Sequence, residues 1–169
     1  MSTIAMHLAT RVQRITGDMA RFALPVSQLF LRAALAVPFF TSGLTKWDGF
    51  LSLAPTAQFL FESIFKLHLF GHAYAMPFPD TLAFFDGIGE IVLPILLVLG
   101  LATRFSALGL LVMTAVIELV VPSGWANFHL PWASMALAII ALGAGPLSLD
   151  YVLVRSLHRQ EKTATGVTQ

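Results

Sequence analysis

The chain has 169 residues, of which 57% are hydrophobic and 11% charged, and its formal net charge is +1. A soluble domain carries about 25% charged residues. The few charges of this chain could not cover a surface exposed to water, whereas a surface that faces lipid needs no charged side chains. The near-neutral charge excludes a nucleic-acid-binding patch. The absence of cysteine excludes disulfides, zinc–thiolate sites, iron–sulfur clusters and thiol catalysis.

The N-terminal segment, residues 1–21, predicts an amphipathic helix lying on the membrane over residues 3–20. Its apolar residues recur at helical spacing, namely Ile4, Leu8, Ile15, Met19 and Phe22. A free, disordered tail is the alternative. No small-residue cleavage site follows, so the segment does not resemble a cleaved signal peptide.

Four later stretches are long and apolar enough to cross a membrane, which takes roughly 20 residues. They are residues 22–44, 82–101, 105–121 and 130–144. The sequence therefore predicts an all-α, four-transmembrane-helix bundle in a membrane domain of residues 22–154, followed by a tail of residues 155–169.

Lys and Arg set the orientation of such a bundle, because they concentrate in cytoplasmic segments. Arginines occupy the N-terminal segment, the turn at Arg104 and the tail, while only Lys46 and Lys66 lie on the other side. Both termini are therefore expected in the cytoplasm of a bacterium, with the protein in the inner membrane. The loops of residues 46–80 and 122–128 would face the periplasm, and LSLDYVLVRSLHRQ would form an interfacial helix before a disordered end.

The long loop predicts a further interfacial helix in TAQFLFESIFKLHLF, residues 56–70. Glu62 and Lys66 stand four residues apart in the favourable order for a helical ion pair. This helix would cap the outer mouth of the bundle and end before Pro77.

Asp86 and Glu90 are the candidate proton-handling, catalytic residues, since both lie on one face of the second span. An ion in hydrocarbon is costly, so Glu90 needs a proton or a partner. Arg32 lies within about 6 Å of its depth by helical rise and is the expected partner, directly or through water. The alternative is that Arg32 reaches the cytoplasmic headgroups.

Other polar residues gather near the outer ends of the spans and predict a ligand-binding cavity there. These are Lys46, Glu118, Trp125 and His129. The competing interpretation is ordinary interfacial polarity with anchoring by Trp47, Trp125 and Trp132. His68, His72 and Met76 have a spacing that would suit copper on a helix, but Gly71 and Pro77 interrupt it, so no metal is predicted.

The order and spacing of several short motifs resemble the DoxX family of small four-helix membrane proteins. They are Arg32, then SGLTKW at 42–47, GIGEIVLPILLVLGLATR at 87–104 and GPLSLDYVL at 145–153. The resemblance implies an integral membrane protein linked to redox processes, in some members a quinone-linked oxidoreductase subunit or a partner of a copper-peptide system. The long His- and Phe-rich first loop departs from the family pattern.

Three function classes follow from these residues. The first is an accessory subunit of an oxidoreductase, with a quinone head group in the cavity and protons handled by Glu90 and Asp86. The second is a small proton-coupled transporter or exporter that uses the same buried charges, with a homodimer as one form, for which Pro38 and Pro94 hint at broken helices. The third is a membrane scaffold for a soluble oxidoreductase or another periplasmic partner protein.

Overall fold

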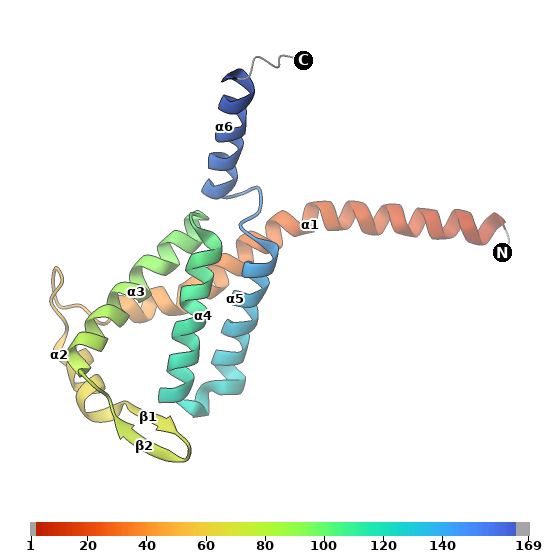
Figure 1. Cartoon of the computed structure of the whole chain (residues 1–169). Helices are drawn as coiled ribbons and strands as arrows, with labels where there is room; N and C mark the ends of the chain where they lie inside the picture. The colour runs from red at the N-terminus through yellow and green to blue at the C-terminus, as the bar shows by residue number, and fades with distance from the viewer. Residues whose placement is uncertain (1–2, 165–169) are drawn as a thin grey trace.

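The computed structural model describes residues 3–164 of the chain, and four long helices form its body (Figure 1). They are α1 (Thr3–Leu44), α3 (Pro79–Leu99), α4 (Thr103–Val120) and α5 (Leu130–Leu142). Both α1 and α4 pack against α3 and α5. The prediction of an all-α four-helix bundle is confirmed. The end that carries the long loop is called the loop end below, and the end with the α3–α4 turn is called the turn end.

Each of the four helical segments is long and apolar enough to cross a membrane. The predicted second and third spans agree with α3 and α4 to within three residues at each boundary. The fourth apolar segment is longer than predicted, because residues 122–128 are helical turns rather than a loop. They form η2 (Pro122–Gly124) and η3 (Trp125–His129), which lead directly into α5.

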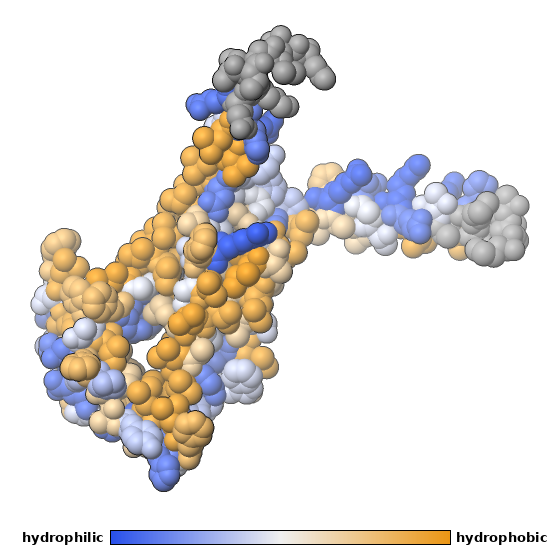
Figure 2. All heavy atoms as spheres, viewed as in Figure 1, coloured by the Kyte–Doolittle hydropathy of each residue, from blue (hydrophilic) through white to orange (hydrophobic). Residues whose placement is uncertain are grey.

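The surface of the bundle is mostly apolar (Figure 2), with exposed side chains such as Phe30, Val37, Phe105 and Val112. In water these residues would favour aggregation, whereas in lipid they have a matching solvent. Buried apolar side chains from the four long helices form a small core. This core is formed by Leu35, Ala36, Phe39, Leu97, Ala107, Leu110, Ala136 and Ile139, and its alanines let neighbouring helices approach closely.

The first helix differs from the prediction, since a single helix runs from Thr3 to Leu44 without a break between residues 20 and 22. Pro25 and Pro38 lie inside it. The N-terminal half projects away from the bundle, roughly across the direction of α4 and α5 (Figure 1).

The long loop corrects the prediction of one helix over residues 56–70. The helical part is α2 (Pro55–Phe59) followed by the π-helical turn η1 (Leu60–Ile64), and Phe65 is already extended. The chain then forms an antiparallel hairpin of β1 (Lys66–Leu69) and β2 (His72–Ala75). Phe70 and Gly71 both have positive φ, as a two-residue type I′ turn requires, and this turn signal favours strands over a continued helix. Lys66 is therefore in a strand and does not form the predicted helical pair with Glu62.

The C-terminal helix α6 (Leu149–Ala164) projects from the turn end (Figure 1). It covers residues 149–160 of the predicted interfacial segment 147–160 and extends across the expected boundary between residues 154 and 155. The predicted disordered end lies partly outside the described residues.

Candidate functional site

The charged centre of the loop end joins α1 to α3. Lys46 Nζ lies 3.1 Å from Asp86 Oδ2 and also donates a hydrogen bond to Glu90 Oε2. Ser42 Oγ accepts a third contact from the same ammonium at 3.3 Å. The side chain of Glu90 is only 4% exposed and that of Lys46 12%. With all three groups ionised, one positive and two negative charges leave the cluster at −1.

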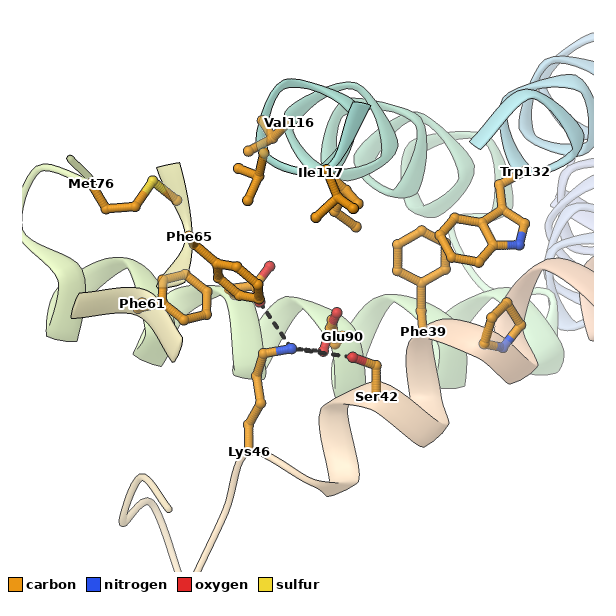
Figure 3. A pocket seen from close by; sticks show the side chains of 14 residues that line it. Phe39, Ser42, Lys46, Phe61, Phe65, Met76, Glu90, Val116, Ile117 and Trp132 are labelled. Atoms are coloured by element: carbon orange, nitrogen blue, oxygen red, sulfur yellow. Dashed lines mark hydrogen bonds and ion pairs between the residues drawn. The ribbon is translucent and has the colours of Figure 1, made fainter. Parts of the chain in front are cut away.

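A pocket of about 210 Å³ opens beside this cluster and receives residues from all four long helices (Figure 3). Its polar groups are Ser42, Lys46, Asp86 and Glu90. The remaining walls are apolar or aromatic and consist of Pro38, Phe39, Phe61, Phe65, Met76, Val116, Ile117, Val120, Val121 and Trp132. Figure 2 shows an opening in this half of the molecule, where α3 and α4 diverge from their shared turn. The polar atoms are therefore gathered at one point of an otherwise apolar chamber.

Two glycines allow α1 and the segment after it to lie close to α3. A Cβ on Gly43 would lie 2.9 Å from the Cβ of Glu90, and one on Gly87 would lie 2.8 Å from the Trp47 ring. Neither position has room for a larger residue without movement of its neighbours. Trp47, expected as a membrane anchor, instead packs against this face of α3 and contacts Phe84 with ring centroids 5.5 Å apart.

The predicted pairing of Arg32 with Glu90 is wrong. Arg32 is fully buried at the turn end, where its guanidinium donates hydrogen bonds to the carbonyl oxygens of Leu147, at 2.6 Å, and Val98, at 3.4 Å. It does not extend to headgroups either. Side chains lean toward their helix N-terminus, and this direction takes Arg32 away from Glu90. The cation that pairs with Glu90 is Lys46, which lies just beyond the end of α1.

Arg32 belongs to a second polar cluster that fastens the turn end, which we call the clamp and define as Gln28, Arg32, Ser148 and Asp150. Gln28 Nε2 donates to the carbonyl oxygen of Leu142 at 3.1 Å, near the end of α5. The carboxylate of Asp150 accepts hydrogen bonds from the backbone N–H groups of Ala102 and Thr103 at 2.8 and 2.9 Å. Arg32 and Gln28 thus donate to carbonyl groups at the C-terminal ends of α3 and α5. Asp150 accepts from N–H groups at the N-terminal end of α4, and both arrangements are favoured by the helix dipoles.

The pKa of Asp150 reflects this capping. Partial burial by itself would raise the pKa, but the hydrogen bonds from Thr103 and Ala102, with the nearby positive charge of Arg32, outweigh it and hold the pKa below its usual value of 3.8. The Asp150 carboxylate is therefore ionised at neutral pH, which is the form that caps α4.

Glu118 and His129 form a separate pair rather than part of the Lys46 cluster. His129 Nδ1 lies 2.5 Å from Glu118 Oε2, and the histidine side chain is 4% exposed. Its ring stacks beside Trp132 with centroids 5.6 Å apart, and Trp132 lines the pocket. This pair therefore lies next to Trp132 but does not line the chamber that was predicted to hold it.

The remaining predicted residues are dispersed. Trp125 is 48% exposed and does not line the pocket. His68 and His72 lie on opposite faces of the hairpin, because His68 is paired with Ala73 and His72 with Leu69 and neighbouring strand residues alternate faces. Met76 lines the pocket instead. The helical spacing that suggested copper is thus not present.

Sequence reasoning missed Ser42 and the aromatic walls of the pocket. Phe39, Ser42 and Lys46 are spaced by three and four residues, which places them on one helical face and could have identified Ser42. Phe61 and Phe65 could not be found this way, because the loop that carries them folds back over the bundle.

This fold and site define a class of protein: a membrane-spanning helix bundle with a buried, charged pocket at one end. The DoxX family model matches residues 27–123 of the chain. An uncharacterized protein of Haemophilus influenzae is 34% identical over 140 residues, which cover 76% of this chain and 83% of that protein. No solved structure matches the chain. The chain belongs to the DoxX family, and the matched region contains Lys46, Asp86, Glu90 and Arg32.

Proposed function

We propose that the loop-end pocket binds the head group of a lipid-soluble quinone, and that the protein is an accessory membrane subunit of an oxidoreductase. The observation that carries this proposal is the Lys46–Asp86–Glu90 cluster, which is the polar part of a chamber with apolar and aromatic walls. Such a chamber suits an amphipathic molecule with a polar ring and an apolar tail. We also propose, from the arginine distribution, that the loop end faces the periplasm of a bacterial inner membrane.

The size of the pocket narrows the ligand class. Its volume of about 210 Å³ is below the range of about 300–1,000 Å³ that is typical for drug-sized ligands. A single-ring head group fits this volume, with its tail leaving along the apolar residues Val116 and Val120 of α4.

The proposed chemistry uses the charge imbalance of the cluster. Reduction of a quinone to a quinol takes up two electrons and two protons, with the electrons supplied by a partner oxidoreductase. The cluster has one carboxylate more than Lys46 neutralises, and Glu90 and Asp86 are the groups proposed to hold and transfer the protons. In the bound state the ionised Glu90 would accept a hydrogen bond from a quinol hydroxyl, along which a proton is transferred.

The structure gives less support to a transporter. Pro38 and Pro94 lie within unbroken helices, whereas substrate sites in many carriers use interrupted helices. The turn end is filled by the clamp, with Arg32 fully buried. An alternating-access cycle would have to dismantle this cluster.

The test is the quinone content of the purified protein. The wild type and Glu90→Gln are expressed in a quinone-containing membrane, purified in mild detergent and extracted for chromatography. Loss of a hydrogen bond to a charged group is expected to lower quinone affinity about 10- to 100-fold. Ile117→Trp, which fills the apolar side of the pocket, should also remove the quinone, while the exposed-site control Glu62→Gln should retain it.

Two outcomes would overturn the proposal. One is a folded Glu90→Gln protein that retains a full complement of quinone. The other is a wild-type protein without quinone that co-purifies with a soluble oxidoreductase, equally well with and without Glu90→Gln, which would indicate a scaffold instead.

A further inference from the structure

The N-terminal half of α1 leaves the bundle as an exposed helix with an apolar stripe. All side chains from Arg11 to Leu24 are exposed, and Figure 1 shows this segment pointing away from the other helices. The stripe consists of Leu8, Val12, Ile15, Met19 and Phe22, which are 65, 53, 60, 66 and 82% exposed. Their alternating spacing of four and three residues places them on one face. The described part of the chain therefore shows an apolar helix face that its own fold does not cover.

The stripe continues into the lipid-facing surface of the first spanning helix. Val26 and Phe30, 49 and 68% exposed, extend it toward the bundle. The segment also runs roughly across α4 and α5 (Figure 1), which is the direction of a helix lying in the plane of a bilayer surface. A single apolar surface thus passes from the membrane-spanning part to the projecting part.

The charge of this segment favours an anionic surface. Arg11, Arg14 and Arg21 stand against the single acid Asp18, so three positive charges and one negative charge give +2. At 3.6 residues per turn the arginines lie on one flank of the stripe and on the side opposite to it. In Figure 2 hydrophilic atoms gather on the side of this helix that faces away from the loop end. The apolar stripe and the basic flank match the two layers of a bilayer surface, acyl chains and negative headgroups.

We infer that residues 8–22 of α1 form a docking surface for an anionic lipid bilayer at the turn end of the bundle. Charge complementarity and continuity with the lipid-facing surface select lipid over a second copy of the chain, because two copies would bring equal charges of +2 together. This inference does not depend on the proposed quinone site, since the two surfaces lie at opposite ends of the bundle.

The test uses cysteine labelling, for which the chain has no background thiols. Ile15→Cys places a fluorophore on the stripe, and Gln13→Cys places one on the opposite side of the same helical turn. The full-length protein is reconstituted into vesicles of phosphatidylcholine alone or with phosphatidylglycerol, and quenching by aqueous acrylamide is measured. In anionic vesicles the Ile15 label is expected to be shielded and the Gln13 label accessible.

Arginine removal separates an electrostatic docking surface from a merely apolar one. Each arginine near an anionic surface is expected to strengthen binding about fivefold. The Arg11→Gln/Arg14→Gln variant should therefore lose most of the shielding of the Ile15 label in anionic vesicles. The charge-matched control Arg155→Gln/Arg159→Gln, on α6, should leave it unchanged.

Three results would overturn the inference. One is equal quenching of the Ile15 and Gln13 labels in anionic vesicles. The second is shielding of the Ile15 label that survives removal of both arginines. The third is shielding that rises with protein concentration and accompanies cross-linking between Ile15→Cys chains, which would make a second copy the occupant.

Discussion

Lys46 shows how one side chain determines the character of the pocket. It is the cation that lies between Asp86 and Glu90, and all three groups are taken largely out of water. Taking charges out of water is costly unless they are paired, and removing one partner of a buried pair leaves the other uncompensated. The stability of the loop end should therefore depend on Lys46 more than on any exposed cation.

Lys46→Met is expected to lower the free energy of unfolding by about 3–5 kcal/mol, because it leaves two carboxylates in the chamber without a cation. Addition of Glu90→Gln should recover part of this loss, since only one carboxylate then remains. Thermal unfolding in detergent of the two single variants and the double variant measures the coupling. Strictly additive effects would show that Lys46 and Glu90 do not interact, and Lys66→Met, outside the pocket, serves as the control.

Asp150 gives the turn end a predictable pH dependence. Its pKa is depressed below the usual 3.8, so its stabilisation is complete above that value and is lost as the pH falls through the lower pKa of the folded state. Asp150→Asn is expected to cost about 1–2 kcal/mol at neutral pH, in the range of a lost helix cap.

The difference in melting temperature between wild type and Asp150→Asn should shrink as the pH is lowered from about 6 to about 3. The exposed residue Asp48 supplies the control, because Asp48→Asn removes a carboxylate that does not cap α4. A difference that stays constant over this range would contradict the role of the ionised carboxylate.

At the scale of elements, the crossing of α1 and α3 determines where the pocket lies. Gly43 brings the backbone of α1 against Glu90 of α3. A Cβ on Gly89, on the same helix as Glu90, would instead lie 3.2 Å from the sulfur of the flexible Met113 side chain. The two glycines thus offer a matched comparison between a rigid and an adaptable neighbour.

Gly43→Ala is expected to destabilise the bundle by about 1–3 kcal/mol, the usual cost of overpacking, and to displace Glu90. Gly89→Ala should cost less, because the Met113 side chain can move. Melting temperatures in detergent, together with quinone content, measure both effects. Equal losses for the two variants would contradict a specific role for the α1–α3 crossing.

The elements themselves were largely predictable from sequence. Runs of about 20 apolar residues have few alternatives in a membrane, so the boundaries of α3 and α4 were predicted to within three residues. The helix α1 begins earlier than predicted, and the fourth apolar segment begins already at Pro122. The loop was harder, because its residues 56–70 carry a helical pattern that the turn at Phe70 and Gly71 overrides. The helical turns of η2 and η3 were missed for a similar reason, since Pro122 and Gly124 of η2 favour a loop in isolation.

For the site, the sequence pointed to Asp86 and Glu90 because charges inside an apolar helix stand out, and to Lys46 because it follows the end of the first span. The partner of Glu90 was assigned wrongly, since depth along a helix axis does not show in which direction a long side chain extends. The pairing of Asp150 with the α3–α4 turn could not be predicted either, because it joins residues 47 and 48 positions apart in the chain. Such contacts depend on how the helices assemble.

At the scale of the whole molecule, the two ends of the bundle differ in kind. Polar contacts at the turn end join helix termini to one connecting segment. Toward the loop end α3 and α4 diverge (Figure 1), and the chamber lies in that half. The charged centre is thus separated from the fastened end by about half the length of α3. The pocket and the polar contacts that fasten the helices therefore lie in different halves of the protein.

The clamp has a mechanical consequence for entry to the chamber. With α3 and α4 held at a common fulcrum, a tilt displaces each residue in proportion to its distance from the turn. Glu90 lies ten residues from Gly100, or about 15 Å along the axis, so a tilt of about 5° moves it by only about 1.3 Å. Tilting of α3 and α4 about their shared turn would therefore separate their loop-end residues most and leave the residues next to the turn almost in place. Amide hydrogen exchange should accordingly be fastest near Val120 and slowest near Thr103.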